Sequence, residues 1–114
     1  RPEAVDQSVE MRRERIDQMR AMADLAEQER MLTEETNERL ACYWFEIRGD
    51  KKNMLEDERR SNLRTFQRLM MADDIFRAMD IAHSRKPLYA ANNRQLWSYF
   101  CGVCWKIIKD VKNG

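Results

Sequence analysis

The sequence predicts an all-α protein with a long N-terminal helix, able to form a coiled coil, followed by a compact C-terminal helical bundle. Gly and Pro, which interrupt helices, number only 3 and 2 among 114 residues. Charged residues make up 36% of the chain, and Glu, Arg, Met, Leu and Ala are abundant. Nowhere do β-branched residues alternate with polar ones over the length of a strand. We therefore divide the chain into a helix over residues 1–48 and a helical domain over residues 49–114.

The first 48 residues are expected to form one helix that needs a partner. Pro2 suits a first helical turn, and no further Pro or Gly occurs before Gly49, a suitable C′ residue. Apolar residues recur at helical spacing along one stripe: Val5, Val9, Ile16, Met19, Ala23 and Ala26. A helix cannot bury so narrow a stripe alone. We expect it to form a homo-oligomer through a coiled coil, to dock a protein partner, or to pack onto its own chain.

Three shorter helices are expected in the C-terminal domain. The first begins near Met54, after a polar connector. The second has Asp73 as its N-cap and ends around Ser84, because Pro87 disfavours helical geometry in the residue before it. A loop over residues 88–92 precedes the last helix, one side of which should be buried. Its apolar stripe consists of Leu96, Phe100, Val103, Ile107 and Val111, widened by Trp97, Cys104 and Ile108.

Basic and aromatic residues are mixed in the segment from Ser84 to the end of the chain. Six bases stand there against one acid, Asp110. They are our candidate nucleic-acid-binding residues: Arg85, Lys86, Arg94, Lys106, Lys109 and Lys112. Cations neutralise phosphates, and Tyr89 or Trp97 would offer a surface on which bases stack. The alternative interpretation treats the bases as a solvated rim and assigns three aromatic residues to the core, namely Trp97, Phe100 and Trp105.

Charge and cysteine content indicate which surfaces the chain offers to partners and in which compartment it works. The net charge of +1 hides a balance of −4 in residues 1–48 and +5 in residues 49–114, which fits an acidic docking helix and a local basic surface. Three cysteines, an odd number, indicate reduced thiols in an intracellular, cytoplasmic compartment, with the nucleoid or nucleus as alternatives. No apolar run approaches the ~20 residues of a membrane span. We expect no membrane partner.

The motifs that carry catalytic or metal chemistry are missing. Cys101 and Cys104 form a C-x-x-C pair, but a second pair of zinc ligands would have to come from Cys42 and His83, the only His. His83 is expected to cap a helix end or to lie exposed. The sequence has no phosphate-binding Gly loop, no H-E-x-x-H and no Ser/His/Asp set. We therefore predict a protein that is not an enzyme and that holds no metal or other cofactor.

Two strings stand in order in the C-terminal domain, DIFRAMDIA at residues 74–82 and YFCGVCW at residues 99–105. Together with the following residues to 112, about a third of the chain, they resemble the C-terminal module of DnaD-like replication and primosome proteins. In that family a helix reading roughly AIxxA precedes one reading roughly YIxxILxxW. The residues that carry the likeness are Ala78, Ile81 and Ala82 in the first helix, and Tyr99, Val103 and Cys104 in the second.

The resemblance implies a helical module that works on DNA in replication. In the family, the basic part that follows the second helix contributes to DNA binding. Lys106, Lys109 and Lys112 correspond to it by place. The family's tryptophan falls where this chain has Ile107, whereas Trp105 comes earlier.

These observations lead to one functional hypothesis and one alternative. The first is a non-enzymatic helical interaction module associated with nucleic acid, in DNA replication or nucleoprotein assembly, whose basic C-terminal part contacts phosphates. The alternative is a structural adaptor or subunit of a larger assembly that makes no nucleic-acid contact. Because the chain begins with Arg1, we also expect it to be a piece of a longer or processed protein.

Overall fold

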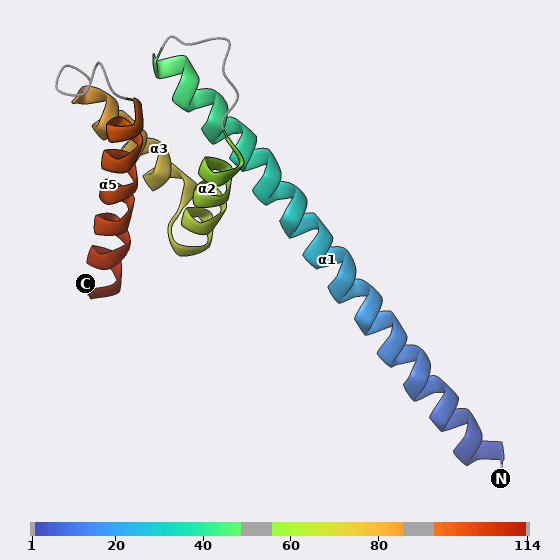
Figure 1. The fold of residues 1–114 in the computed structure, drawn as a ribbon. Coiled ribbons are helices and arrows are strands. Elements are labelled where there is room, and N and C mark those ends of the chain that lie inside the picture. Colours follow the sequence, from blue (N-terminus) through green and yellow to red (C-terminus); the bar gives the residue numbers. More distant parts are fainter. Residues whose placement is uncertain (1, 49–55, 86–92, 114) are drawn as a thin grey trace. The chain divides into compact units, whose positions relative to one another are not determined.

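The computed structural model describes residues 2–48, 56–85 and 93–113 (Figure 1). Its helices are α1 (Pro2–Arg48), α2 (Asp57–Leu69), α3 (Ala72–Ser84) and α5 (Asn93–Asn113). The described ranges contain no strand, so the predicted all-α fold is confirmed. None of the helices described combines the length and the apolar character needed to cross a membrane. The expected cap at Gly49, the connector that follows it and the loop at residues 88–92 lie outside the described ranges.

The chain divides into two units, residues 1–32 and residues 33–114. In the first unit α1 is a solitary helix, and every side chain described there, from Gln7 to Leu32, is exposed. In the second unit the last turns of α1 pack together with α2, α3 and α5. The prediction divided the chain at residue 48, whereas the compact unit also takes in residues 33–48.

One apolar core holds the helices of the second unit together. Trp44 of α1 is completely buried, with its ring centroid 4.9 Å from that of Trp97 and 5.3 Å from that of Phe100 on α5. The Phe100 ring also lies 6.0 Å from that of Phe66 on α2. Tilted and edge-to-face contacts at such distances are favourable for aromatic rings. The rest of the core comprises Leu40, Ala41, Leu63, Ile75, Ala78, Met79, Ala82, Leu96 and Cys104.

The helix boundaries in the middle of the chain differ from the prediction. Helix α2 begins at Asp57, with Glu56 in the N-cap position, and the start predicted near Met54 lies outside the described residues. The predicted cap at Asp73 is wrong, because Met71 holds the extended N-cap position and Asp73 lies in the first turn of α3. An acid in the first turn still interacts favourably with the helix dipole. The break itself comes from Met70, which is extended at φ −151° and ψ 163°.

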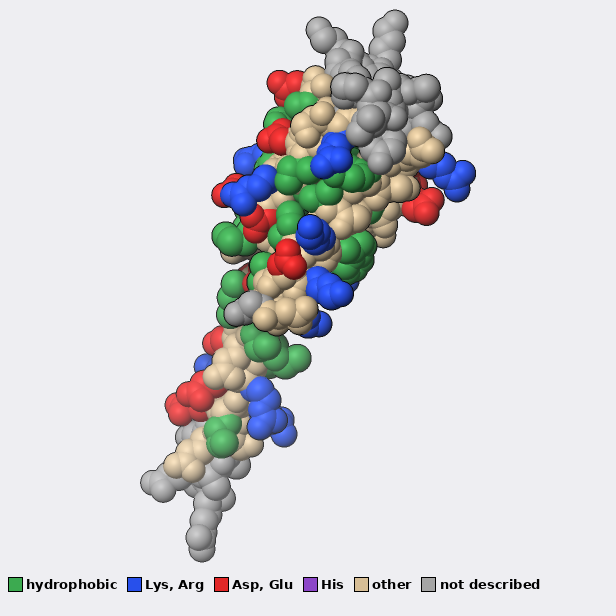
Figure 2. Space-filling view, turned by 90° about the vertical axis from the view of Figure 1, so that its left-hand side faces the viewer, with side chains coloured by type: hydrophobic (Ala, Val, Ile, Leu, Met, Phe, Trp, Pro, Cys, Tyr) green, Lys and Arg blue, Asp and Glu red, His purple; other side chains and the backbone are tan. Residues whose placement is uncertain are grey.

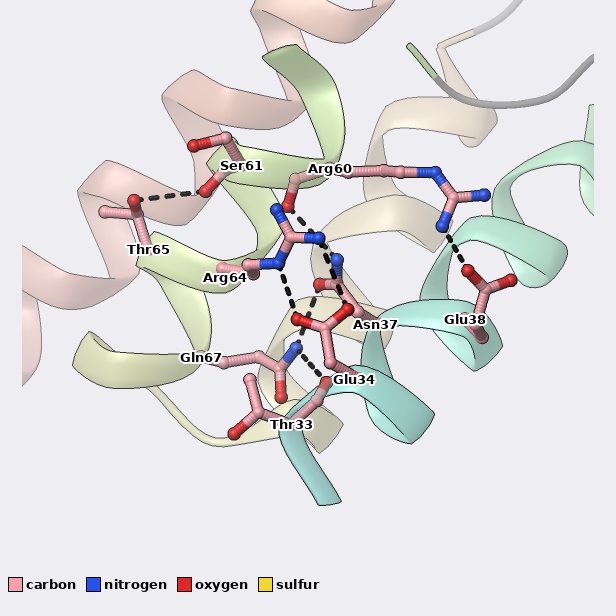
Figure 3. Close-up of polar contacts among 9 residues, drawn as sticks. All are labelled: Thr33, Glu34, Asn37, Glu38, Arg60, Ser61, Arg64, Thr65 and Gln67. Carbon is pink, nitrogen blue, oxygen red and sulfur yellow. Dashed lines mark hydrogen bonds and ion pairs between the residues drawn. The ribbon is translucent and has the colours of Figure 1, made fainter. Parts of the chain in front are cut away.

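A polar cluster joins the C-terminal part of α1 to α2 (Figure 3). Asn37 is completely buried, and its Nδ2 donates a hydrogen bond to the Arg60 carbonyl at 3.1 Å. Its Oδ1 accepts a hydrogen bond of 3.0 Å from Gln67 Nε2, which also donates to the Thr33 carbonyl at 3.1 Å. A buried amide with both its donor and its acceptor engaged specifies one relative position of two helices. The cluster therefore fixes how α2 sits on α1.

Two ion pairs flank this cluster at the surface. Arg64 donates from Nε and Nη2 to the two carboxylate oxygens of Glu34, at 2.7 and 3.2 Å, and Arg60 pairs with Glu38 (Figure 3). The hydrogen bond from Arg64 holds the pKa of the Glu34 carboxyl below its usual value. Solvent-exposed pairs of this kind contribute only about 0–1 kcal/mol. The buried amides should therefore matter more to stability than the ion pairs.

Replacing the buried amide tests this ranking. Asn37→Ala removes a completely buried amide together with its hydrogen bonds to the Arg60 carbonyl and to Gln67, both part-buried, and should lower the free energy of unfolding by about 1–3 kcal/mol. Glu34→Gln removes only an exposed ion pair and should lower it much less. Urea denaturation followed by tryptophan fluorescence measures both values, since Trp44 and Trp97 are buried in the same unit. Equal losses in the two variants would contradict the ranking.

Candidate nucleic-acid interface

Helix α5 has one buried side and one exposed side. Leu96, Phe100 and Cys104 enter the core. Residues spaced by three or four positions lie on the same side of a helix, and such a series of exposed residues runs along α5. We call this exposed side the α5 surface; it consists of Arg94, Ser98, Gly102, Trp105, Lys109 and Lys112, with Lys106 beside them.

The N-terminal half of the α5 surface borders a groove of about 750 Å³ between α2 and α5. Trp97 forms one wall but is only 6% exposed, and the Arg59 guanidinium lies 5.2 Å from its ring centroid. This cation–π contact covers the ring. Trp97 therefore belongs to the core, and its ring is not the stacking surface that one interpretation assigned to it. The groove is lined by Glu56, Glu58, Arg59, Asn62, Arg94, Trp97, Ser98, Cys101, Gly102 and Trp105.

Of the two tryptophans that line the groove, Trp105 is the exposed one. Its ring centroid lies 5.4 Å from that of Phe66, yet the residue is 50% exposed. The interpretation that placed Trp105 in the core is therefore wrong for this residue. The signal was present in the sequence, because Trp105 lies four residues before Lys109 and so shares the polar side of the helix.

At Gly102, in the middle of the α5 surface, no side chain extends from the helix. Within a helix, Gly is less favourable than Ala by about 1 kcal/mol. Apart from its chain neighbours and the adjacent backbone of its own helix, no described atom lies within 4 Å of the position that a Cβ on Gly102 would take, so packing against other parts of the described chain does not require glycine there. Glycine is commonly used where a ligand or another backbone comes close to the main chain. Gly102 thus marks a place where an external group can approach α5 beside Trp105.

Four of the six predicted cations lie exposed on α5: Arg94 in its first turn, and Lys106, Lys109 and Lys112 in its last turns. Arg85 follows α3 and is exposed, with its guanidinium carbon 5.7 Å from the ring centroid of Tyr99. Tyr99 precedes Lys106 by seven residues, close to two helical turns, so Arg85 stands on the Lys106 side of the surface. Lys86 and Tyr89 lie outside the described residues.

The charge of this region is uneven. In the groove, the acids Glu56 and Glu58 balance the bases Arg59 and Arg94. Farther along α5 the exposed charges are three lysines against Asp110. Lys112 also lies in the last turn, where a cation interacts favourably with the helix dipole. The positive potential that would attract phosphate is therefore concentrated on the C-terminal turns of α5.

Cys101, Cys104 and His83 occupy packed positions, whereas Cys42 is exposed. Burial raises the pKa of Cys101 to about 11 and that of Cys104 to about 12, so both thiols are protonated at neutral pH. The thiol is neither the metal-binding nor the nucleophilic form. Over residues 2–48, 56–85 and 93–113 no three His, Cys, Asp or Glu side chains are grouped to hold a metal. His83 lies in the last turn of α3, at the helix end where a cap was expected, but it is not exposed, because its ring packs 4.7 Å from that of Trp44.

Thiol reactivity checks this description. Cys42 is exposed and should be alkylated first at pH 8, in a single fast phase. With a pKa of about 11, the thiolate fraction of Cys101 at that pH is only about one in a thousand, and Cys104 should react more slowly still. Cys42→Ser should remove the fast phase and leave the other two thiols slow until the protein is unfolded. Three thiols reacting at one rate in the folded protein would refute the assignment.

Comparison of the chain with protein-family models, with curated proteins and with solved structures gives no significant match. The likeness to DnaD-like replication proteins therefore rests on the helix strings at residues 74–82 and 99–105 alone. In the chain's own geometry, the exposed side of α5 carries four cations, a half-exposed tryptophan and a glycine with open space above it.

Proposed function

We propose that this chain is a non-enzymatic helical interaction module that contacts nucleic-acid phosphates through the α5 surface. Its setting would be DNA replication or nucleoprotein assembly, as the likeness to DnaD-like proteins implies. The N-terminal helix supplies a contact with a protein partner or a second copy. Phosphate contacts from lysine and arginine give affinity without sequence specificity, which suits a surface made of flexible cations.

One observation carries the proposal, namely that the exposed side of α5 carries both cations and an exposed aromatic ring. Trp105 has Lys109 one turn beyond it and Gly102 one turn before it. A nucleotide whose base stacks on Trp105 would place its phosphates near those lysines, and the backbone at Gly102 leaves room for the sugar. Stacking on an aromatic side chain contributes about 1–3 kcal/mol per base, and it tolerates any sequence.

The alternative function is that of a structural adaptor, and two observations favour it. The groove has as many acids as bases, so it does not by itself attract phosphate. In addition, the first unit exposes large apolar side chains that suit a protein partner. Under this alternative the lysines of α5 would meet acidic side chains of another protein.

Nucleic-acid binding at low salt separates the two functions. Fluorescence anisotropy with short single-stranded DNA, duplex DNA and RNA should detect binding that weakens steeply as salt rises. Lys106→Glu combined with Lys109→Glu should abolish it, because two phosphate contacts become repulsive. Trp105→Ala removes a stacking surface but no charge, so it should weaken binding while leaving the slope against salt unchanged.

The matched control reverses two cations that lie on other helices. Arg68 on α2 and Arg77 on α3 are both exposed, and Arg68→Glu with Arg77→Glu changes the net charge by the same amount. This control should retain most of the binding. If the unaltered chain binds none of the three nucleic acids at low salt, the proposal is wrong and the adaptor function is favoured.

Gly102→Ala tests whether the open space above α5 is used. No described atom blocks the new methyl group, so the substitution should raise the free energy of unfolding by about 0.5–1 kcal/mol. The same methyl group should weaken nucleic-acid binding if the ligand approaches the backbone there. Urea denaturation and anisotropy on one protein preparation give both numbers. A more stable variant with unchanged affinity would show that the ligand does not contact this part of α5.

A further inference from the structure

The helix over residues 7–32 exposes apolar side chains along its whole length. Figure 2 shows apolar side chains at the surface of this segment, between acidic and basic ones. The large apolar residues here are between 43% and 70% exposed: Val9, Met11, Ile16, Met19, Met22, Leu25, Met31 and Leu32. A helix with this much uncovered apolar surface is typical of one that binds another helix.

Part of this apolar surface has the spacing of a coiled-coil seam. From Ile16 onward its members are separated by three, four and three residues, the spacing of alternating a and d positions. Ile16 and Ala23 then occupy a positions, and Met19 and Ala26 occupy d positions. We call this set, preceded by Val9 one heptad before Ile16, the N-terminal seam.

We propose that the N-terminal seam pairs with the same seam of a second copy, in an antiparallel two-stranded coiled coil centred near residue 21. The inference rests on the proposed function only in giving this helix a protein partner, and it names that partner as another copy of the chain. Antiparallel pairing places Ile16 of one copy beside Ala26 of the other, and Met19 beside Ala23. Each layer combines a large residue with a small one, so the two helices approach closely and the flexible Met fills the remaining space.

The charges that flank the seam fit the antiparallel arrangement. In an antiparallel pair, the residue just before an a position of one copy faces the residue just before an a position of the other copy, so Arg15 of one copy faces Glu29 of the other. In the same way, the residues just after the d positions of the two copies face each other, so Arg13 of one copy faces Glu27 of the other. Because a two-fold axis relates the copies, each attractive pair occurs twice. Flanking charges of this kind decide the orientation of coiled coils.

The parallel arrangement would instead bring like charges together. In a parallel pair each position before an a residue faces the position five residues later in the partner. Arg15 would then face Arg20. Arg30 at an a position would also meet its own counterpart. The sequence thus disfavours the parallel dimer and favours the antiparallel one.

Shifting the antiparallel register by one heptad also loses favourable contacts. A shift in one direction places Arg13 opposite Arg20. A shift in the other places Met19 in a layer with Arg30. The register proposed here has two unfavourable contacts. Near the two-fold axis, Arg20 of one copy faces Arg20 of the other, and at each end of the pair Arg12 of one copy lies near Arg30 of the other. Long arginine stems can carry the charges of Arg12, Arg20 and Arg30 into solvent.

Sedimentation of the full chain tests the pairing and its direction. At micromolar concentrations and low salt the mass should be twice that of the 13.8-kDa chain. Arg15→Glu should weaken the antiparallel dimer about tenfold, because two attractive pairs become repulsive. Glu29→Arg should have the same effect, and the two changes together should restore the dimer. In a parallel dimer Arg15→Glu would face Arg20 and would strengthen association.

A zero-length crosslink gives the direction independently. Residues 1–50 contain no Lys, so Arg15→Lys introduces a single amine into the helix. Carbodiimide activates a carboxylate, and the lysine amine then forms an amide bond with loss of the activated oxygen as urea. Positions 15 and 29 of one helix are about 21 Å apart, so a bond between them joins two copies. Mass spectrometry should identify a peptide that links position 15 to Glu29.

The outcomes separate this inference from the proposed function. A strict monomer, tighter association of Arg15→Glu, or absence of the 15–29 link in a dimer would each overturn the antiparallel pairing. None of these substitutions touches the α5 surface, so anisotropy with the same DNA and RNA can be measured on every variant. Binding retained by a monomeric chain would reject only the pairing. A dimer of the expected kind that binds no nucleic acid would reject only the nucleic-acid contact.

Discussion

The packing of Trp44 against Trp97 and Phe100 determines which side of α5 faces solvent. The three rings belong to two helices that are far apart in the sequence, and their centroids lie 4.9–5.3 Å from one another. Each large aromatic side chain buries a substantial apolar area, and together they would be costly to expose. Because this face of α5 is buried in the core, the opposite face, which carries the lysines and Trp105, is exposed to solvent. The candidate interface is thus a consequence of the core.

The two units distribute their polar and apolar groups in opposite ways. In residues 33–114 the apolar side chains are inside, and a buried amide cluster around Asn37 fixes the relative position of two helices. In residues 7–32 the apolar side chains are outside, and charged residues flank them. The first arrangement gives a unit with its own core. The second gives a helix whose apolar surface is available to a partner.

The sequence predicted the helices well and individual side-chain environments less well. The scarcity of Gly and Pro and the three-and-four spacing were sufficient for the fold class and for one buried side of α5. Spacing gives the side of a helix on which a residue lies, but not the contacts that it makes with other helices. The spacing of Trp105 and Lys109 indicated the exposed side of α5, whereas the contact of Trp105 with Phe66 of α2 could not be predicted from it.

His83 and Asp73 show the same limit in other ways. The position of His83 depends on a contact with Trp44, 39 residues earlier, which no local pattern reveals. Asp73 is a good N-cap residue by type, but the break was set by the extended backbone of two methionines before it. The environments of His83 and Asp73 were therefore determined by a long-range contact and by backbone geometry. The exposure of the α5 lysines could be predicted without either, because lysines on the polar side of a half-buried helix face solvent in almost any packing.

The most direct test of the account is a map of the nucleic-acid contact on the folded chain. Backbone amide resonances followed by NMR during titration with a short single-stranded DNA report each residue separately. The account predicts the largest shifts along the exposed side of α5, at Gly102, Trp105 and Lys109, with little change at Leu96 and Phe100 on the buried side. Shifts confined to α2 and α3, or no shifts at low salt, would contradict it.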